Sequence, residues 1–269
     1  NIAIDGQRLT FSSIHIAGRS NFKIYNCSFR NYTDGGVWFT GRNDNNEAAP
    51  ATFATGNQFY NNRMVHCASY VHDFGGGNLG YFGLAQLNFG GQTGMLVHNN
   101  YFDQQTDYTW KGDGGKGVGW CIKYASGGYT KGCKIYNNTF LKIPYQGTYG
   151  GDGGWDFAIE IFRSQGMEIY NNTSQGSFDF NHDWDVDPAY SYNLWIHDNT
   201  ISQPALSNFS ESGIIFEVEA RNVIVERNTI YNVNWGVILS VLGTSTGFKN
   251  FVIRNNLMYN LGKHGGNGG

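Results

Sequence analysis

Short apolar runs alternate with polar pairs along the chain, and the pattern recurs from near the start to near the end. Each unit has an alternating segment, a polar pair that is usually Asn-Asn, and a second short apolar segment. Strict alternation predicts β-strands, because successive side chains of a strand point to opposite faces. The units occupy residues 23–29, 54–59, 95–102, 133–140, 167–174, 194–201, 223–230 and 251–258.

The period of these units indicates how the strands are arranged. The second polar residue of the pair falls at Cys27, Asn57, Asn100, Asn138, Asn172, Asn199, Asn228 and Asn256, and the last four steps are 34, 27, 29 and 28 residues. This period is shorter than a propeller blade of about 40–45 residues. It suits one turn of a parallel β-helix with three short strands, so the sequence predicts about eight stacked coils.

The recurring asparagine has a physical explanation. At a sharp bend between strands the residue must tolerate a left-handed backbone, which asparagine does better than most residues. Its amide can also bond the equivalent amides one coil above and below. This pattern resembles the Asn ladder of the pectate-lyase-like superfamily, and the resemblance covers roughly residues 10–260. It implies an all-β, right-handed parallel β-helix of a carbohydrate-active superfamily, but it does not specify the reaction.

The chain is expected to form one domain, residues 1–269, with loop insertions at 60–82, 103–119 and 141–156. We expect it to be part of a longer protein, because an open coil end would expose strand edges and invite association. Long loops in a compact fold are commonly binding loops. Those at 103–119 and 141–156 carry Trp110, Tyr149 and Trp155, and flat aromatic faces suit sugar rings.

A strand that precedes each Asn pair carries the candidate chemistry. Aligned by the repeat, these strands direct Ile122, Ile159, Val186 and Phe216 inward. The outward residues at the matching position are then Gln86, Lys123, Glu160, Asp187 and Glu217, with Asp185 and Glu219 two residues away on the same face. Carboxylates on neighbouring coils, about 4.8 Å apart, repel one another, and at least one pKa should rise.

A raised carboxyl pKa beside an ionised neighbour is the arrangement that glycoside hydrolysis uses. We therefore expect a polysaccharide-degrading glycoside hydrolase with Glu160 as the general acid and one of Asp185, Asp187 or Glu217 as the base or nucleophile. The arrangement resembles β-helical glycosidases, including phage tailspike endoglycosidases. The coil spacing alone leaves retention and inversion open. The expected substrate-binding residues are Lys123, Gln86, His182, Arg163, Trp110, Trp155 and Tyr149.

An acidic stretch could form a calcium site, although the hydrolase hypothesis requires no cofactor. Asp183, Asp185 and Asp187 share one face and could bind Ca²⁺ through carboxylate oxygens. The β-helical mannuronan epimerases have an Asp-Pro-His motif, but here Asp187-Pro188 is followed by Ala189.

The composition of the chain indicates which classes of partner it can bind. Charged residues make up 14% of the chain and the net charge is −3, which gives no electrostatic footprint for nucleic acid or an anionic membrane. No apolar run approaches the roughly 20 residues of a membrane helix. We expect a secreted or extracellular protein, or one at the cell surface, whose partner is a polysaccharide or oligosaccharide. Four cysteines leave both disulfides and free thiols open.

Two other functions remain open at this stage. The first is a calcium-dependent polysaccharide lyase with Lys123 as base, since lyases of this fold usually pair a Lys or Arg base with carboxylate-bound Ca²⁺; Arg163 also lies near the acids. The excess of acid over base disfavours an anionic polymer unless metal is bound. The second is a non-catalytic carbohydrate-binding or adhesin β-helix, which predicts no loss of function when the acids are replaced.

Overall fold

The computed structural model describes residues 1–7, 9–10, 12–32, 35–41, 52–67, 72–73, 79–80, 85–103, 120–125, 128–141, 157–181, 191–203, 212–217, 220–240 and 248–262. All regular elements in these ranges are strands that form three long parallel sheets, apart from one short antiparallel pair, β9 (His72–Asp73) and β10 (Leu79–Gly80). Within the same ranges, no helix is long and apolar enough to cross a membrane.

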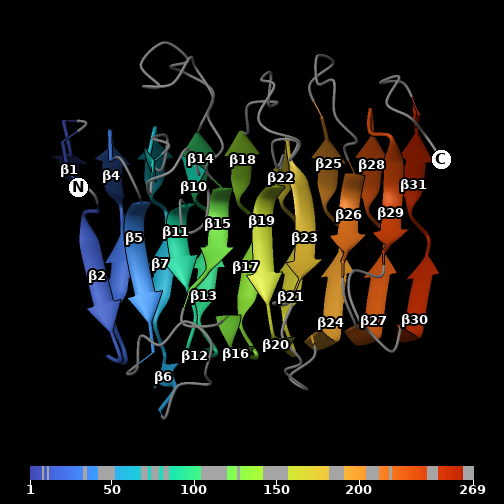
Figure 1. Cartoon of the computed structure of the whole chain (residues 1–269), viewed down its shortest axis with the longest axis horizontal. Coiled ribbons are helices and arrows are strands. Elements are labelled where there is room, and N and C mark those ends of the chain that lie inside the picture. Colours follow the sequence, from blue (N-terminus) through green and yellow to red (C-terminus); the bar gives the residue numbers. More distant parts are fainter. Residues whose placement is uncertain are drawn as a thin grey trace.

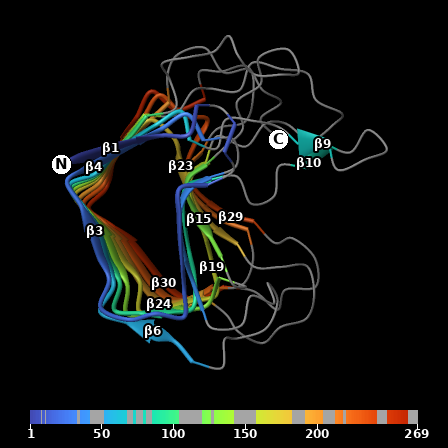
Figure 2. The same ribbon diagram turned by 90° about the vertical axis from the view of Figure 1, so that its left-hand side faces the viewer.

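The three sheets wind as the sides of one solenoid, which Figure 1 shows from the side and Figure 2 from its end. Sheet A contains β1 (Ile2–Asp5), β4 (Cys27–Arg30), β8 (Arg63–Val65), β14 (Tyr101–Asp103), β18 (Thr139–Leu141), β22 (Thr173–Ser174), β25 (Thr200–Ser202), β28 (Thr229–Tyr231) and β31 (Leu257–Tyr259). Sheet B contains β2 (Ile14–Ala17), β5 (Gly35–Thr40), β11 (Ala85–Phe89), β15 (Trp120–Tyr124), β19 (Phe157–Phe162), β23 (Ser177–Asn181), β26 (Ser212–Phe216) and β29 (Trp235–Leu239). Sheet C contains β3 (Lys23–Tyr25), β6 (Ala54–Thr55), β7 (Gln58–Tyr60), β12 (Gln92–Thr93), β13 (Leu96–His98), β16 (Thr130–Lys131), β17 (Lys134–Tyr136), β20 (Ser164–Gln165), β21 (Glu168–Tyr170), β24 (Ser191–His197), β27 (Ala220–Glu226) and β30 (Lys249–Arg254).

The core runs along the inside of the solenoid as columns of stacked apolar side chains. The Phe102 ring of sheet A lies 5.1 Å from Phe140 on the next coil of the same sheet and 6.4 Å from Phe59 of sheet C on the preceding coil, measured between centroids. On sheet B, Ile122 pairs with Ile159, and both are fully buried. Strands that alternate core-facing and solvent-facing residues can stack only in this register. The predicted all-β, right-handed parallel β-helix is therefore confirmed.

The two residues of the polar pair have different roles. The first has a left-handed backbone, with φ between 53° and 56° at Asn26, Asn61, Asn99, Asn137, Asn171, Asp198, Arg227 and Asn255. The second points inward and bonds its counterparts: the main-chain N–H and Nδ2 of Asn100 both donate to Asn138 Oδ1 at 3.0 Å, and those of Asn138 donate to Asn172 Oδ1. The sequence interpretation gave both roles to one residue.

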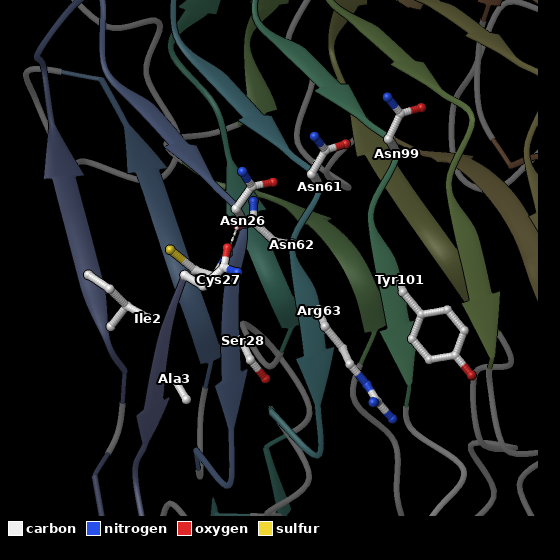
Figure 3. Close-up of a pocket in the computed structure, with 11 residues that line it drawn as sticks. Ile2, Ala3, Asn26, Cys27, Ser28, Asn61, Asn62, Arg63, Asn99 and Tyr101 are labelled. Atoms are coloured by element: carbon white, nitrogen blue, oxygen red, sulfur yellow. Dashed lines mark hydrogen bonds between the residues drawn. The ribbon is translucent and has the colours of Figure 1, made fainter.

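This column of asparagine-to-asparagine hydrogen bonds runs from Asn62 to Asn256. In the second coil its member is Asn62 and not Asn57, because β7 extends to Tyr60 and the polar pair follows it. Asn57 lies at another bend, where its amide donates to Gln92 Oε1 and accepts from the Phe22 N–H. Figure 3 shows Asn26, Asn61 and Asn99 outward and Asn62 beside Cys27.

The expected insertions begin later than the sequence suggested in one case. Residues 60–67 complete β7, form β8 and turn toward the next strand, so they belong to the coil. The rest of the three insertions lies outside the described residues, except for β9, β10 and the terminal residues 103 and 141. All four cysteines are free thiols, and burial raises the pKa of Cys67 and Cys133 to about 12.

Candidate active site

A row of charged side chains lies on the outer face of sheet B. Lys123 of β15 pairs with Glu160 of β19, and Glu160 pairs with Asp179 of β23. Their strand neighbours Ile122, Ile159 and Phe178 point into the core, so the charged residues point away from it. Adjacent members of the row are therefore one strand spacing, about 4.8 Å, apart at the backbone.

Glu217 extends this row onto the next strand. Asp179 pairs with Ile215 of β26, and the main-chain N–H of Glu217, just after β26, donates to the Phe180 carbonyl at 3.0 Å. Glu217 thus lies one strand over from Asp179 and one alternation further along. We call Glu160, Asp179 and Glu217 the carboxyl cluster, which occupies three successive strands beside Lys123.

All members of this site are buried: 6% of Glu160, 0% of Asp179 and 7% of Glu217 is exposed. Burial raises the pKa of Glu160, and Lys123 opposes the shift. Burial, reinforced by the charges of Glu217 and Glu160, holds the pKa of Asp179 well above its usual range. Burial and the Glu160 charge raise the pKa of Glu217 to about 7. The site therefore retains protons that exposed carboxyl groups would lose.

Lys123 is the single basic residue of this row and is only 1% exposed. Its ammonium group forms a buried ion pair with Glu160 Oε2, and lies 3.6 Å from the Trp120 ring centroid and 4.9 Å from that of Tyr124. A buried cation held by a carboxylate and two rings stabilises negative charge on Glu160. The expected direct contact between Lys123 and substrate does not match this enclosed position.

Asp179 is the most enclosed member of the cluster. Neither of its carboxyl oxygens has a hydrogen-bond partner of normal geometry, and the amide of Phe180 lowers its pKa only slightly against the other effects. An ionised, fully buried carboxylate without donors would be very costly. Asp179 therefore holds its proton more strongly than an exposed aspartic acid does.

Three expectations about this face are corrected by the register. Gln86 does not join the row: it is fully buried and its Nε2 donates to the Asp103 carbonyl at 3.0 Å, while Asn88 pairs with Lys123. The position expected for Asp187 is held by Asp179, since β23 is residues 177–181. Glu217 is displaced by two residues along its strand, because Ile214 and not Phe216 aligns with Phe178.

Of the remaining predicted residues, Arg163 is the one that the structure describes. Arg163 sits between β19 and β20 with φ 43°, and its guanidinium carbon lies 5.2 Å from the Tyr129 ring centroid. Asp185, Asp187, His182, Trp110, Trp155 and Tyr149 lie outside the described residues. The calcium site expected at Asp183, Asp185 and Asp187 thus stays a prediction. Among the residues that are described, no group of three or more His, Cys, Asp or Glu could hold a metal ion.

Asp179 was missed by sequence reasoning, although Ser177–Asn181 has a usable signal. Phe178 and Phe180 alternate with Asp179, the pattern of a strand with one outward acid. The sequence alignment of the coils used the more acidic stretch that follows, residues 182–188, in place of this strand.

A concave patch on another part of the surface has no comparable chemistry. It has a volume of about 610 Å³ and lies over β1, β4, β8 and β14 of sheet A, where Asn26, Asn61, Asn99 and Arg63 line it (Figure 3). No carboxyl side chain lines this patch. The carboxyl cluster on sheet B therefore remains the candidate site.

No protein-family model and no curated protein sequence matches the chain. Among solved structures, it is similar to the GH136 lacto-N-biosidase from Eubacterium ramulus, with 12% sequence identity and a TM-score of 0.41. The matched region covers 94% of this chain and 45% of that one, so the chain spans less than half the length of that enzyme.

Proposed function

We propose that the protein is a secreted glycoside hydrolase that cleaves a polysaccharide or oligosaccharide at the outer face of sheet B. The observation that supports this most is the carboxyl cluster: three buried acids on successive strands, all with a raised pKa, beside one buried lysine. Glycoside hydrolysis needs one carboxylic acid that is still protonated at working pH and a second group that is ionised.

Glu217 is the proposed general acid, and Glu160 the proposed base. Glu217, with a pKa of about 7, is protonated in weakly acidic solution and can donate to the glycosidic oxygen. The ion pair with Lys123 opposes the effect of burial on Glu160 and favours its ionised form, which can take a proton from the attacking water. This assignment reverses the acid role that the sequence suggested for Glu160. Asp179, which lies between them and has a raised pKa, is a positioning residue.

The strand spacing disfavours retention of the anomeric configuration. Glu160 is on β19 and Glu217 follows β26, and these strands are separated by β23, so the two backbones lie about 9.6 Å apart across the sheet. Because Glu217 is also two residues, or about 6.6 Å, further along its strand, the backbones are about 12 Å apart in all, and the carboxyl groups come closer only where the side chains lean toward each other. Inverting enzymes hold their two carboxyl groups about 6.5–9.5 Å apart, which leaves room for a water molecule, and retaining enzymes about 5–5.5 Å. In this mechanism the C–O bond breaks as Glu217 donates its proton, and Glu160 deprotonates the water that attacks the opposite face.

The lyase alternative has no observation in its favour at this site. Its base would be Lys123, whose ammonium group is engaged by Glu160 and the rings of Trp120 and Tyr124. A lyase base must instead meet the substrate directly.

The test is a panel of purified neutral and uronic-acid polysaccharides, with chelator and without. We expect new reducing ends on at least one neutral glycan, no ultraviolet absorbance from an unsaturated product, and unchanged activity in chelator. Unsaturated products that disappear with chelator would establish the lyase instead. Binding without any cleavage across the panel would favour the adhesin reading.

The pH dependence of hydrolysis should report the pKa of Glu217. A general acid works only while protonated, so kcat/KM should fall about tenfold per pH unit above the Glu217 pKa of about 7. Initial rates between pH 5 and 9 on a cleaved glycan measure this limb. A rate that stays level from pH 7 to pH 9 would contradict the role of Glu217.

A further inference from the structure

A second group of buried polar side chains adjoins the carboxyl cluster. Ser177 begins β23, Ser212 begins β26, and Gln203 follows β25; each is 1–2% exposed. Ser177 Oγ donates to the Ser212 carbonyl, and Gln203 Nε2 donates to Ser177 Oγ at 3.3 Å. These bonds hold the three residues together across two neighbouring strands and the preceding bend.

Part of this group lacks partners. Ser212 Oγ and Gln203 Oε1 are buried and make no hydrogen bond, and the same holds for both carboxyl oxygens of Asp179 nearby. Buried polar atoms are nearly always paired, because an unmade hydrogen bond costs about 1–3 kcal/mol. Four such atoms lie in and beside this one group, and a ligand that supplies the missing bonds would account for them.

The group faces the same side of sheet B as the acids. Ser177 and Asp179 are two residues apart on β23, which places them on one face about 6.6 Å from each other along the strand. Ser177 pairs with Phe157, which packs with Ala85 and Trp120 in an apolar cluster separate from the core. That cluster and Ile215 provide an apolar floor next to the polar atoms.

We propose that Ser177, Ser212 and Gln203 form a subsite that binds the hydroxyl groups of a neutral sugar unit next to the cleaved bond. The proposal rests on the proposed function and adds the substrate class. Gln203 Oε1 can only accept a hydrogen bond, while Ser212 Oγ can donate and accept. A sugar hydroxyl can donate to Gln203 Oε1 and can form a hydrogen bond with Ser212 Oγ. The CH face of the sugar ring suits the apolar floor.

An anionic sugar does not fit this subsite. The carboxylate or sulfate group of such a sugar has no hydrogen to give to Gln203 Oε1, and its charge would be buried near Glu160, whose counter-ion Lys123 is already paired. The subsite therefore selects neutral glycans over uronic-acid polymers.

Two variants test this proposal on the intact chain, Ser212→Ala and Gln203→Met. Steady-state hydrolysis of a neutral hexasaccharide that the parent cleaves, chosen from cello-, xylo- and mannohexaose, should show KM raised about three- to tenfold for each variant with a smaller change in kcat. Because Ser212→Ala removes an atom that has no partner in the protein, its thermal midpoint should equal or exceed that of the parent, whereas Gln203→Met also removes the long bond from Nε2 to Ser177 Oγ and should lower the midpoint slightly. Hexagalacturonate should not be cleaved.

The matched control is Ser164→Ala, which removes a buried hydroxyl that already bonds Thr130 Oγ1 at 2.8 Å and the Phe162 carbonyl at 3.2 Å. It should lower the thermal midpoint and leave KM unchanged. Parental KM values in Ser212→Ala and Gln203→Met during continued hydrolysis would overturn the subsite but not the hydrolase. Hydrolysis of hexagalacturonate would also overturn it, whereas loss of hydrolysis in every neutral and acidic sugar tested would reject the proposed function itself.

Discussion

Glu217→Gln should lower kcat for glycan hydrolysis by about 10²–10⁴-fold, with KM changed only a few-fold. The amide keeps the shape of the side chain but cannot donate the proton that the leaving oxygen needs. Its pH–rate profile should also lose the alkaline limb near pH 7, because that limb reports the Glu217 pKa. Initial rates on the cleaved glycan, measured from pH 5 to 9, check both effects.

Glu160→Gln should be equally damaging to turnover, since it removes the proposed base. It also leaves Lys123 buried without its ion-pair partner, which is destabilising by about 3–5 kcal/mol. Its activity must therefore be measured below the unfolding transition seen by circular dichroism. Lys123→Met combined with Glu160→Gln removes the unpaired charge, so it should recover stability but not activity.

Asp179→Asn distinguishes the positioning role of Asp179 from the catalytic roles of Glu160 and Glu217. Because the raised pKa of Asp179 favours its neutral form, the neutral amide of the same shape should change the site little, and turnover should fall far less than in Glu217→Gln. Glu168→Gln is the control away from the site: this carboxylate lies on sheet C, paired with Lys134 and His197, and should leave kcat unchanged. Full activity in both Glu160→Gln and Glu217→Gln would exclude the carboxyl cluster as the catalytic site.

The fold was predictable because its signal is repeated and local. Each coil carries the same alternating strand and polar pair, and errors in one copy, such as Asn57 in place of Asn62, do not disturb the others. Because the coils stack in register, a residue that faces the core in one coil predicts which residue faces the core at the matching position of the next. Lys123 beside Glu160 could be found in this way.

The register at Asp179 and Glu217 could not be fixed from sequence, because coil length varies on both sides of sheet B. In the coil of β19 the additional residues come before the strand, whereas residues 182–190 come after β23. A constant distance to the following asparagine therefore placed 184–187 in the position that Ser177–Asn181 holds. Alternation cannot detect a slip of two residues, since it returns each side chain to the same face. Glu217 was displaced for this reason.

Asn138→Ala should lower the free energy of unfolding by about 3–5 kcal/mol, the largest expected effect on stability outside the ion pair. The Asn138 side chain accepts from the main-chain N–H and the amide of Asn100, and donates to the Val97 carbonyl and to Asn172 Oδ1. Alanine removes all four bonds inside a dry core, where no water replaces them. Urea unfolding followed by circular dichroism measures the loss.

The neighbouring residue provides the control, because Asn137 adopts the left-handed backbone of the bend and Asn138 forms the hydrogen bonds between coils. Asn137 is exposed with φ 55°, so Asn137→Gly, which adopts this backbone freely, should change the free energy of unfolding by less than about 1 kcal/mol. Equal losses at the two positions would mean that the Asn137 side chain stabilises the fold as much as the hydrogen-bonded column does. A large loss at Asn138 alone would mean that the column stabilises the stacking of coils on which the alignment of Lys123, Glu160, Asp179 and Glu217 depends.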